Sequence, residues 1–277
     1  MGDLSITALY TSETWRWGGL SHAHLFATRE AKRVFDVTNA ALAVARLVRR
    51  DFAPLRHSLV HRHVMIDRLL ADARCRHVIE LAAGLSRRGA AVSSDPAVHY
   101  VELDLPPVIR EKRELLGRTA EGRAVLARPN LALVEADVET APLATWTPRD
   151  APVFVIAEGL LMYLAPDAQR RLFARIAALA DVASEVHLAF DLVPGPELPA
   201  PGRVGRALEV AMKRFTGGRG FARDTRTRRD ILDELAAAGF QATDALTPRD
   251  VATAWRLPHA EQPTQTVVFT ASRATRS

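Results

Sequence analysis

The chain has 277 residues, of which 48% are hydrophobic and 25% are charged, and its formal net charge at pH 7 is +5. This composition is that of an ordinary soluble globular protein and excludes a disordered, a fibrous or a membrane-embedded chain. The positive charge favours an acidic partner, whether a nucleic acid, a membrane surface or a small anion.

The N-terminal residues and the cysteine usage indicate where the protein works. The longest apolar run near the start, 40–48, is far shorter than the roughly 20 residues that a membrane helix needs, and Arg46 interrupts it. The first residues lack the charged-then-apolar order of a signal peptide. Cys75 is the only cysteine, so the chain alone builds neither a disulfide framework nor a cysteine-based zinc site. We expect a cytoplasmic protein without a membrane anchor or a metal.

The segment 1–73 is predicted to form an N-terminal helical cap. Across 29–50 and 55–70, apolar residues recur at three- and four-residue spacing, as in helices with one buried face. The remaining residues, 74–277, are expected to form one domain.

In this second part, short apolar runs alternate with helical patterns, in the order expected of βαβ units. The predicted strands are 77–81, 99–103, 131–135, 153–157 and 186–190, with a late pair at 240–245 and 265–271. The predicted helices are 105–116, 166–180, 204–215 and 227–238. The pattern predicts an α/β fold with a parallel-rich, doubly wound sheet and helices on both faces.

A helical insertion is expected after the fifth strand, at about 193–238. It begins with VPGPELPAPGRVG (193–205), which contains four prolines and three glycines. Such a stretch predicts an ordered connection or a mobile lid.

In a sheet of this kind, ligands bind beyond the carboxyl ends of the strands. The first predicted strand runs into ELAAG (80–84), a turn of small residues that lets the backbone approach a ligand closely. The turn lacks the full G-x-G-x-x-G spacing, and a glycine required there for steric reasons is an equally good explanation.

A carboxylate at the end of the second strand strengthens the nucleotide-site hypothesis. Asp104 follows Gly84 by about 20 residues, the spacing at which a carboxylate accepts hydrogen bonds from both ribose hydroxyls. Glu102 shares its strand face, and we prefer Asp104 because it lies nearer the strand end. The alternative role for Asp104, just before Pro106, is a helix N-cap.

Two more acidic residues follow predicted strands. Asp137, with Val138 beside it, is placed to accept a hydrogen bond from an adenine amino group, although a turn-forming role is the simpler explanation. Glu158 directly follows the apolar run 153–157 and calls for a partner or a cationic ligand.

These motifs resemble the leucine carboxyl methyltransferase family, including its bacterial branch of polyketide O-methyltransferases related to the tetracenomycin carboxyl methyltransferase. The matching stretches are VIELAAGLSRRG, YVELDLPPVIREKRELL, LVEADV and VIAEGLLMYL, and they cover roughly 62–171. The resemblance implies a class I methyltransferase with a Rossmann-like sheet and S-adenosylmethionine as the cofactor.

The resemblance also implies a role for each residue of the cofactor site. Arg62 would grip the carboxylate of the cofactor's methionine moiety, and Glu158 would lie beside that moiety. The other implied contacts are Ala82 and Gly84 at the cofactor turn, Asp104 at the ribose, and Asp137 and Val138 at the adenine.

Two departures favour the bacterial branch over members that modify a protein C-terminus. Eukaryotic members carry glycine where this chain has Ala82, and an acidic residue where it has Ser86. The N-terminal residues Tyr10, Trp15 and His22 also look similar to the bacterial branch. This implies a helical flap over the cofactor, with 194–229 as the other wall of a substrate pocket.

The acceptor decides whether a general base is needed. A carboxylate is already ionised near neutral pH and needs only cations or hydrogen-bond donors to orient it. A hydroxyl needs a base, for which His22 is the first candidate and His24 the second. Tyr163 would hydrogen-bond the acceptor or simply pack its ring.

The favoured function is methylation of a small acidic metabolite, such as a polyketide, on its carboxylate or a phenolic oxygen. The alternatives are methylation of a protein C-terminal carboxylate and cofactor binding without catalysis. Five arginines between 219 and 229 also suggest RNA methylation, but the interspersed Asp224 and Asp230 argue against it. We expect a small-molecule partner and no nucleic acid.

Overall fold

The structure, a computed structural model, describes residues 6–48, 55–197, 224–262 and 264–275. Within these residues a seven-stranded sheet has the order β3-β2-β1-β4-β5-β7-β6. Its strands are β1 His77–Leu81, β2 His99–Asp104, β3 Leu131–Glu135, β4 Val153–Ala157, β5 Glu185–Asp191, β6 Ala242–Leu246 and β7 Val268–Ala274. The pairs among β1 to β5 are parallel, whereas β7 runs antiparallel to both β5 and β6.

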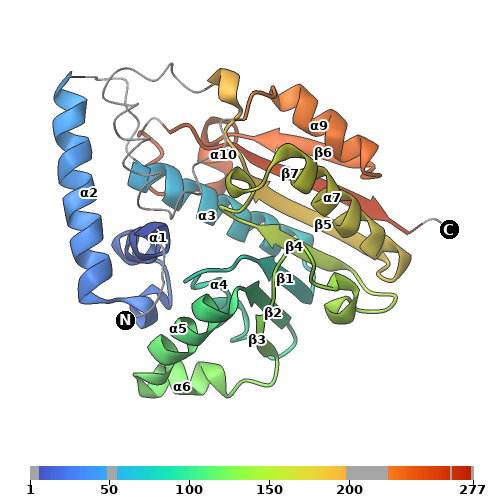
Figure 1. Ribbon diagram of the computed structural model, residues 1–277, viewed down its shortest axis with the longest axis horizontal. Helices are drawn as coiled ribbons and strands as arrows, with labels where there is room; N and C mark the ends of the chain where they lie inside the picture. Colours follow the sequence, from blue (N-terminus) through green and yellow to red (C-terminus); the bar gives the residue numbers. More distant parts are fainter. Residues whose placement is uncertain (1–5, 49–54, 198–223, 263, 276–277) are drawn as a thin grey trace.

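Helices connect the strands and cover the sheet (Figure 1). They are α1 Ile6–Trp17, α2 Arg29–Val48, α3 Leu55–Ala73, α4 Arg88–Val92, α5 Pro106–Gly117, α6 Ala120–Leu126, α7 Pro166–Ala177, α9 Arg228–Ala237 and α10 Pro248–Trp255. Short 3-10 helices lie at η1 Ala23–Phe26, η2 Leu143–Trp146, η3 Leu161–Tyr163, η4 Ala178–Asp181 and η5 Gly195–Glu197. Prolines in the first turn of α5, α7 and α10 favour helix starts, because their fixed φ suits a helix and no N–H bond is lost.

The predicted doubly wound α/β sheet is confirmed. The strands β1, β3 and β4 have the predicted bounds, and β2 and β5 are longer by one residue at one or both ends. The last strand begins at Val268 instead of 265. The predicted helix 204–215 and much of the predicted insertion 193–238 lie outside the described residues.

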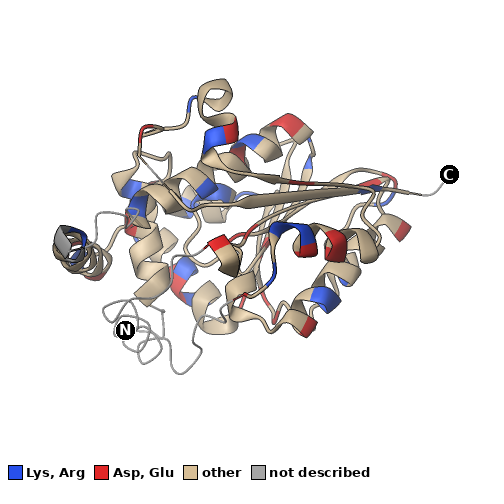
Figure 2. Ribbon diagram, turned by 90° about the horizontal axis from the view of Figure 1, so that it is seen from above, with Lys and Arg blue, Asp and Glu red and all other residues tan. Residues whose placement is uncertain are grey.

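The core has two main layers, one on each face of the sheet (Figure 2). On one face α3 and α10 pack against the strands through residues such as Met65, Ile66 and Val251. On the other face α7 and α9 cover the sheet through Phe173, Ile176 and other buried residues. Since strand side chains alternate, β2 directs Tyr100, Glu102 and Asp104 to the same face.

The N-terminal helices lie at one edge of the molecule, where Figure 1 shows α1 between α2 and the sheet domain. Tyr10 and Trp15 of α1 form a small cluster with Phe35 of α2 and Leu59 of α3. The helix α3 itself packs on β4, β5 and β7 and therefore belongs to the covering layer of the sheet. The division into a cap (1–73) and a domain (74–277) remains a prediction.

Among the described helices, none combines the length and apolar character that crossing a membrane requires.

Candidate functional site

The turn after β1 has an unusual backbone conformation. Both Ala82 (φ 50°) and Gly84 (φ 52°) adopt left-handed conformations, which glycine tolerates and alanine adopts only under constraint. A Cβ atom added at Gly84 would meet no atom within 4 Å, so the turn borders open space. A ligand can therefore approach this backbone closely.

Asp104 lies across this turn at the end of β2. Its Oδ2 accepts a hydrogen bond from the Gly84 N–H at 2.7 Å, and its Oδ1 accepts one from the Leu105 N–H at 2.7 Å. Each carboxylate oxygen has two lone pairs, so one on each oxygen remains for a ligand donor. Burial raises the pKa of Asp104, and the two N–H bonds oppose that rise. The N-cap of α5 is Leu105, so the alternative N-cap role of Asp104 is wrong.

Glu102 has a different partner. It is fully buried and forms an ion pair with Lys112 of α5, whose ammonium also donates a hydrogen bond to the Ser86 carbonyl at 2.8 Å. Burial raises the pKa of Glu102 to about 7, although Lys112 counteracts it. Lys112 thus links α5 to the turn after β1. Because Glu102 is already paired, Asp104 is the carboxylate at the end of β2 that remains available to a ligand.

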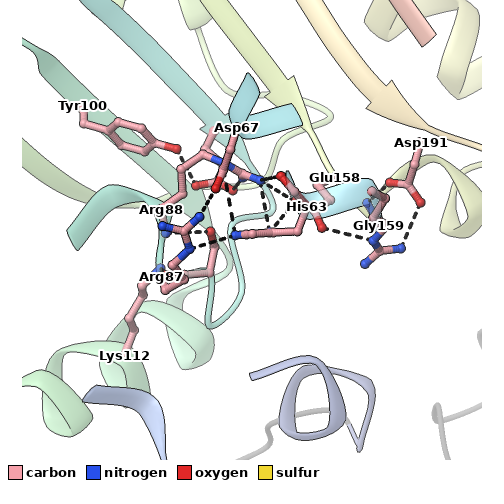
Figure 3. Close-up of polar contacts among 12 residues, drawn as sticks. His63, Asp67, Arg87, Arg88, Tyr100, Lys112, Glu158, Gly159 and Asp191 are labelled. Carbon is pink, nitrogen blue, oxygen red and sulfur yellow. Dashed lines mark hydrogen bonds and ion pairs between the residues drawn. The ribbon is translucent and has the colours of Figure 1, made fainter. Parts of the chain in front are cut away.

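Arg62 and Glu158, predicted from distant parts of the chain, are in direct contact. Figure 3 shows Glu158 close to His63 and Arg88. The Nε of Arg62 donates to Oε1 of Glu158 at 3.0 Å, and its Nη1 donates to Oδ2 of Asp191 at 2.8 Å. Asp191 also accepts a hydrogen bond from the Gly159 N–H. Within the described residues Nη2 of Arg62 makes no hydrogen bond, which leaves its two N–H groups for a ligand.

A second guanidinium, that of Arg88, is fully buried beneath this pair. It contacts Glu158 at 2.7 Å, Asp67 at 2.6 Å, and Glu80. The hydroxyl of Tyr100 donates to Glu80 at 2.7 Å, so both oxygens of Glu80 are used. We call this group the charged cluster; it comprises Arg62, His63, Asp67, Glu80, Arg87, Arg88, Tyr100, Glu158 and Asp191.

His63 lies in the centre of the charged cluster. Its Nδ1 is 2.9 Å from Oε2 of Glu158, and its Nε2 accepts a hydrogen bond from Nε of Arg87 at 3.2 Å. These contacts fit a neutral imidazole with its proton on Nδ1. Burial and the neighbouring Arg88 lower the pKa of His63 to about 4, so the ring is neutral at pH 7.

The charged cluster has an excess of negative charge. Counted by formal charge with His63 neutral, its three arginines and four carboxylates leave one negative charge uncompensated. Burial raises the pKa of Glu158, but its contacts with His63, Arg88 and Arg62 outweigh this and hold that pKa well below the usual range. The site is therefore suited to a ligand that brings a positive charge.

The adenine-site candidates lie after β3. Asp137 is exposed, and its Oδ1 accepts a hydrogen bond from the Glu139 N–H at 2.9 Å, which is the turn-forming role. Val138 is buried, and Nη1 of Arg175 donates to its carbonyl at 2.9 Å. These contacts fix the loop conformation, and a contact of Asp137 or Val138 with adenine remains a prediction.

The two candidate catalytic residues have different neighbours. The charged groups around His22 are those of Glu121, Arg128, His24 and Arg87, and burial lowers its pKa. Its Nδ1 is buried without a hydrogen-bond partner among the described residues. The hydroxyl of Tyr163, by contrast, contacts Thr7 Oγ1 of α1 at 3.4 Å. His24 is exposed and pairs with Glu121 at 2.8 Å.

The described members of the arginine-rich segment have partners within the protein. Arg226 pairs with Asp224 and Glu234, Arg228 with Glu197, and Arg229 with Asp233. Arg219 and Arg223 lie outside the described residues. The described arginines that suggested phosphate binding are thus matched by carboxylates.

Sequence reasoning missed most of the charged cluster. Asp191 ends β5 as Asp104 ends β2, so the same strand-end argument would have found it. Glu80 is a charged residue inside an apolar strand, which also signals a buried partner. Nothing in the local pattern distinguishes Arg88 from the many other arginines of the chain. Within the described residues, no group of His, Cys, Asp or Glu side chains is arranged to hold a metal ion.

Replacing Arg88 tests the cohesion of the charged cluster. We expect Arg88→Met to lower the free energy of unfolding by about 3–5 kcal/mol, because it leaves buried carboxylates without their cation. Urea denaturation measures this change. The control Arg68→Met removes an exposed arginine paired with Asp72 and should change the free energy by no more than about 0.5 kcal/mol. Equal effects of both substitutions would contradict the role assigned to Arg88.

Comparisons with known proteins find methyltransferases related to this chain. A relative from Mycolicibacterium gilvum, named as an S-adenosyl-L-methionine-dependent methyltransferase, is 32% identical over 179 residues, which are 62% of this chain and 56% of the relative. One of the same name from Mycolicibacterium smegmatis is 43% identical over 119 residues, 41% of this chain and 38% of the relative. The chain thus spans about half, or less, of the length of these relatives.

Solved structures share the fold. A crystal structure from Thermobifida fusca, described as a methyltransferase, superposes with a TM-score of 0.59 at 18% identity and covers 97% of this chain and 94% of its own. An O-methyltransferase family protein from Burkholderia thailandensis gives 0.51 at 15% identity, covering 98% and 73%. The family model of leucine carboxyl methyltransferases matches residues 21–177, more than half of the chain. The chain therefore belongs to the leucine carboxyl methyltransferase family.

Proposed function

We propose that this protein transfers a methyl group from S-adenosylmethionine to an oxygen, and that the acceptor is the carboxylate of a small acidic molecule. S-adenosylmethionine is the donor named for the matched relatives, and membership of the family makes it the cofactor of this chain. The observation that carries the proposal is Asp104, whose two oxygens each keep one lone pair beside an open turn.

The residues present fit this cofactor. The two remaining lone pairs of Asp104 equal the number needed by the two ribose hydroxyls. The Nη2 donors of Arg62 suit the cofactor's carboxylate, because a guanidinium binds a carboxylate with charge-assisted hydrogen bonds. The uncompensated negative charge of the charged cluster suits a molecule that carries both an ammonium and a sulfonium. Asp137 and Val138 would flank the adenine.

When bound, the cofactor supplies an electrophilic methyl group. The protein's part is to align the acceptor with that methyl and to exclude water, since the reaction is an in-line displacement in which positive charge disappears. Both ring nitrogens of His63 are engaged by Glu158 and Arg87, so this buried histidine is not available as a base. A carboxylate acceptor needs no base, because it is already ionised near neutral pH.

A role remains for the two candidate catalytic residues. Burial keeps His22 neutral at pH 7, as a base for a hydroxyl acceptor would have to be. Tyr163, directly after the β4 loop that carries Glu158, would orient the acceptor. For a carboxylate acceptor only the orienting role is needed.

Removing the ribose contact should abolish tight cofactor binding. We expect Asp104→Ala to weaken binding of S-adenosylmethionine by about 100-fold or more, because two charge-assisted hydrogen bonds are lost. Arg62→Lys keeps a cation between Glu158 and Asp191 but loses the planar guanidinium with its several N–H donors. It should weaken binding of S-adenosylmethionine by about 10-fold or more. Isothermal titration calorimetry measures both.

The matched control is Asp244→Ala, which removes an exposed carboxylate that also accepts the next N–H along its strand. It should leave the affinity unchanged. Unchanged affinity in both Asp104→Ala and Arg62→Lys, with the fold intact by circular dichroism, would show that the site has been misassigned.

The product identifies the acceptor class. We expect transfer of a radiolabelled methyl group to small aromatic acids, and release of that label as methanol in mild alkali, because an ester hydrolyses and an ether does not. The decarboxylated phenols serve as matched controls and should accept no label. Alkali-stable label on the phenols would contradict a carboxylate acceptor.

A further inference from the structure

The N-terminal helix α1 reaches the charged cluster through one aromatic side chain. Trp15 is buried, and its ring stacks on that of His63 with centroids 4.1 Å apart and planes 26° apart. Since His63 belongs to α3, this stack joins the two helices at a residue that contacts Glu158.

The stack constrains the ring of His63, which is hydrogen-bonded to Glu158. His63 donates from Nδ1 to Oε2 of Glu158, and its far nitrogen is held by Arg87 (Figure 3). A ring that turned away from the indole would change both hydrogen bonds at once. The position of α1 is therefore coupled to the orientation of the Glu158 carboxylate.

Glu158 has little acceptor capacity left. Its Oε2 accepts from His63 and from Arg88, and its Oε1 accepts from Arg62. Of about four lone-pair positions on a carboxylate, three are used, which leaves one on Oε1 for a ligand. The direction of this lone pair on Oε1 depends on how the ring of His63 orients Oε2, because both oxygens belong to one planar carboxylate.

Two further contacts connect α1 and the residues after it to the region around the charged cluster. Tyr163, five residues after Glu158, contacts Thr7 near the start of α1 at 3.4 Å. Ser21, just beyond the end of α1, accepts a hydrogen bond from Nη1 of Arg87 at 3.2 Å. Thr7 near the start of α1, Trp15 near its end and Ser21 beyond it thus contact Tyr163, His63 and Arg87.

We propose that Trp15 and His63 are positioning residues of the cofactor site, through which the seating of α1 sets the direction in which Glu158 meets the methionine end of S-adenosylmethionine. This inference rests on the proposed function. Neither residue needs to touch the cofactor; both act through Glu158.

The same helix offers a control for simple packing. Trp17, two residues from Trp15, stacks on His259 with centroids 5.2 Å apart and meets His57 edge-on at 5.1 Å. Within the described residues neither of these histidines bonds Glu158. Trp17→Leu therefore removes an indole that also packs α1 against the rest of the protein, but it leaves the contacts from Trp15 through His63 to Glu158 unchanged.

The test compares two ligands in calorimetry. S-adenosylmethionine carries the methionine end, whereas 5′-methylthioadenosine keeps the adenine and ribose but lacks the amino and carboxylate groups. We expect Trp15→Leu, which removes the stack, and His63→Phe, which keeps a ring but loses the bond to Glu158, to weaken S-adenosylmethionine by about 10-fold or more. The affinity for 5′-methylthioadenosine should stay within about 2-fold, because Asp104 holds the ribose.

The controls separate the possible outcomes. Trp15→Phe restores a flat ring over His63 and should recover most of the affinity, and Trp17→Leu should leave both affinities within about 2-fold. Equal weakening of both ligands would assign Trp15 and His63 to packing alone and overturn the proposal. Unchanged binding of both ligands would also overturn it while leaving the proposed function in place. Failure of the unmodified protein to bind S-adenosylmethionine would refute the proposed function itself.

Discussion

The fully buried guanidinium of Arg88 is the interaction on which the site depends. It comes from the segment after the β1 turn and contacts Glu80 of β1, Asp67 of α3 and Glu158 beyond β4. Burying charges is expensive unless each has a partner, so the three carboxylates and the arginine require one another. Because they come from separate elements, their pairing fixes where α3 and the β4 loop lie relative to the turn after β1.

This arrangement shows how a basic protein can contain a site that we propose to bind a cation. The chain has an overall formal charge of +5, yet the charged cluster has more carboxylates than cations. Figure 2 shows Lys and Arg interspersed with Asp and Glu over the helices, and the described arginines near 226–229 are paired with carboxylates. The local charge of the site is therefore independent of the net charge of the molecule, and the local charge is the one that a bound cofactor meets.

Much of the fold could be predicted because its strands are short apolar runs separated by helical patterns. The pairing of Gly84 with Asp104 was also accessible, since about 20 residues separate the end of one strand from the end of the next in a βαβ unit. The contact between Arg62 and Glu158 was not, because 96 residues separate them and no local pattern encodes which arginine meets which carboxylate. For the same reason Arg88 and Asp191 were missed, although Asp191 follows the strand-end rule.

The helix α1 illustrates a different limit of sequence reasoning. Its contacts with the site depend on aromatic stacking between Trp15 and His63, which arises only once α3 has packed on the sheet. The helical character of the N-terminal segment could be predicted, but the residue through which it reaches the site could not.

The most direct test of the account is a crystal structure of the protein with S-adenosylhomocysteine, the product form of the cofactor. We expect both ribose hydroxyls to lie within hydrogen-bond distance of the two oxygens of Asp104, and the carboxylate of the ligand to contact Nη2 of Arg62. A ligand bound in another cavity, or one whose ribose is turned away from Asp104, would contradict it.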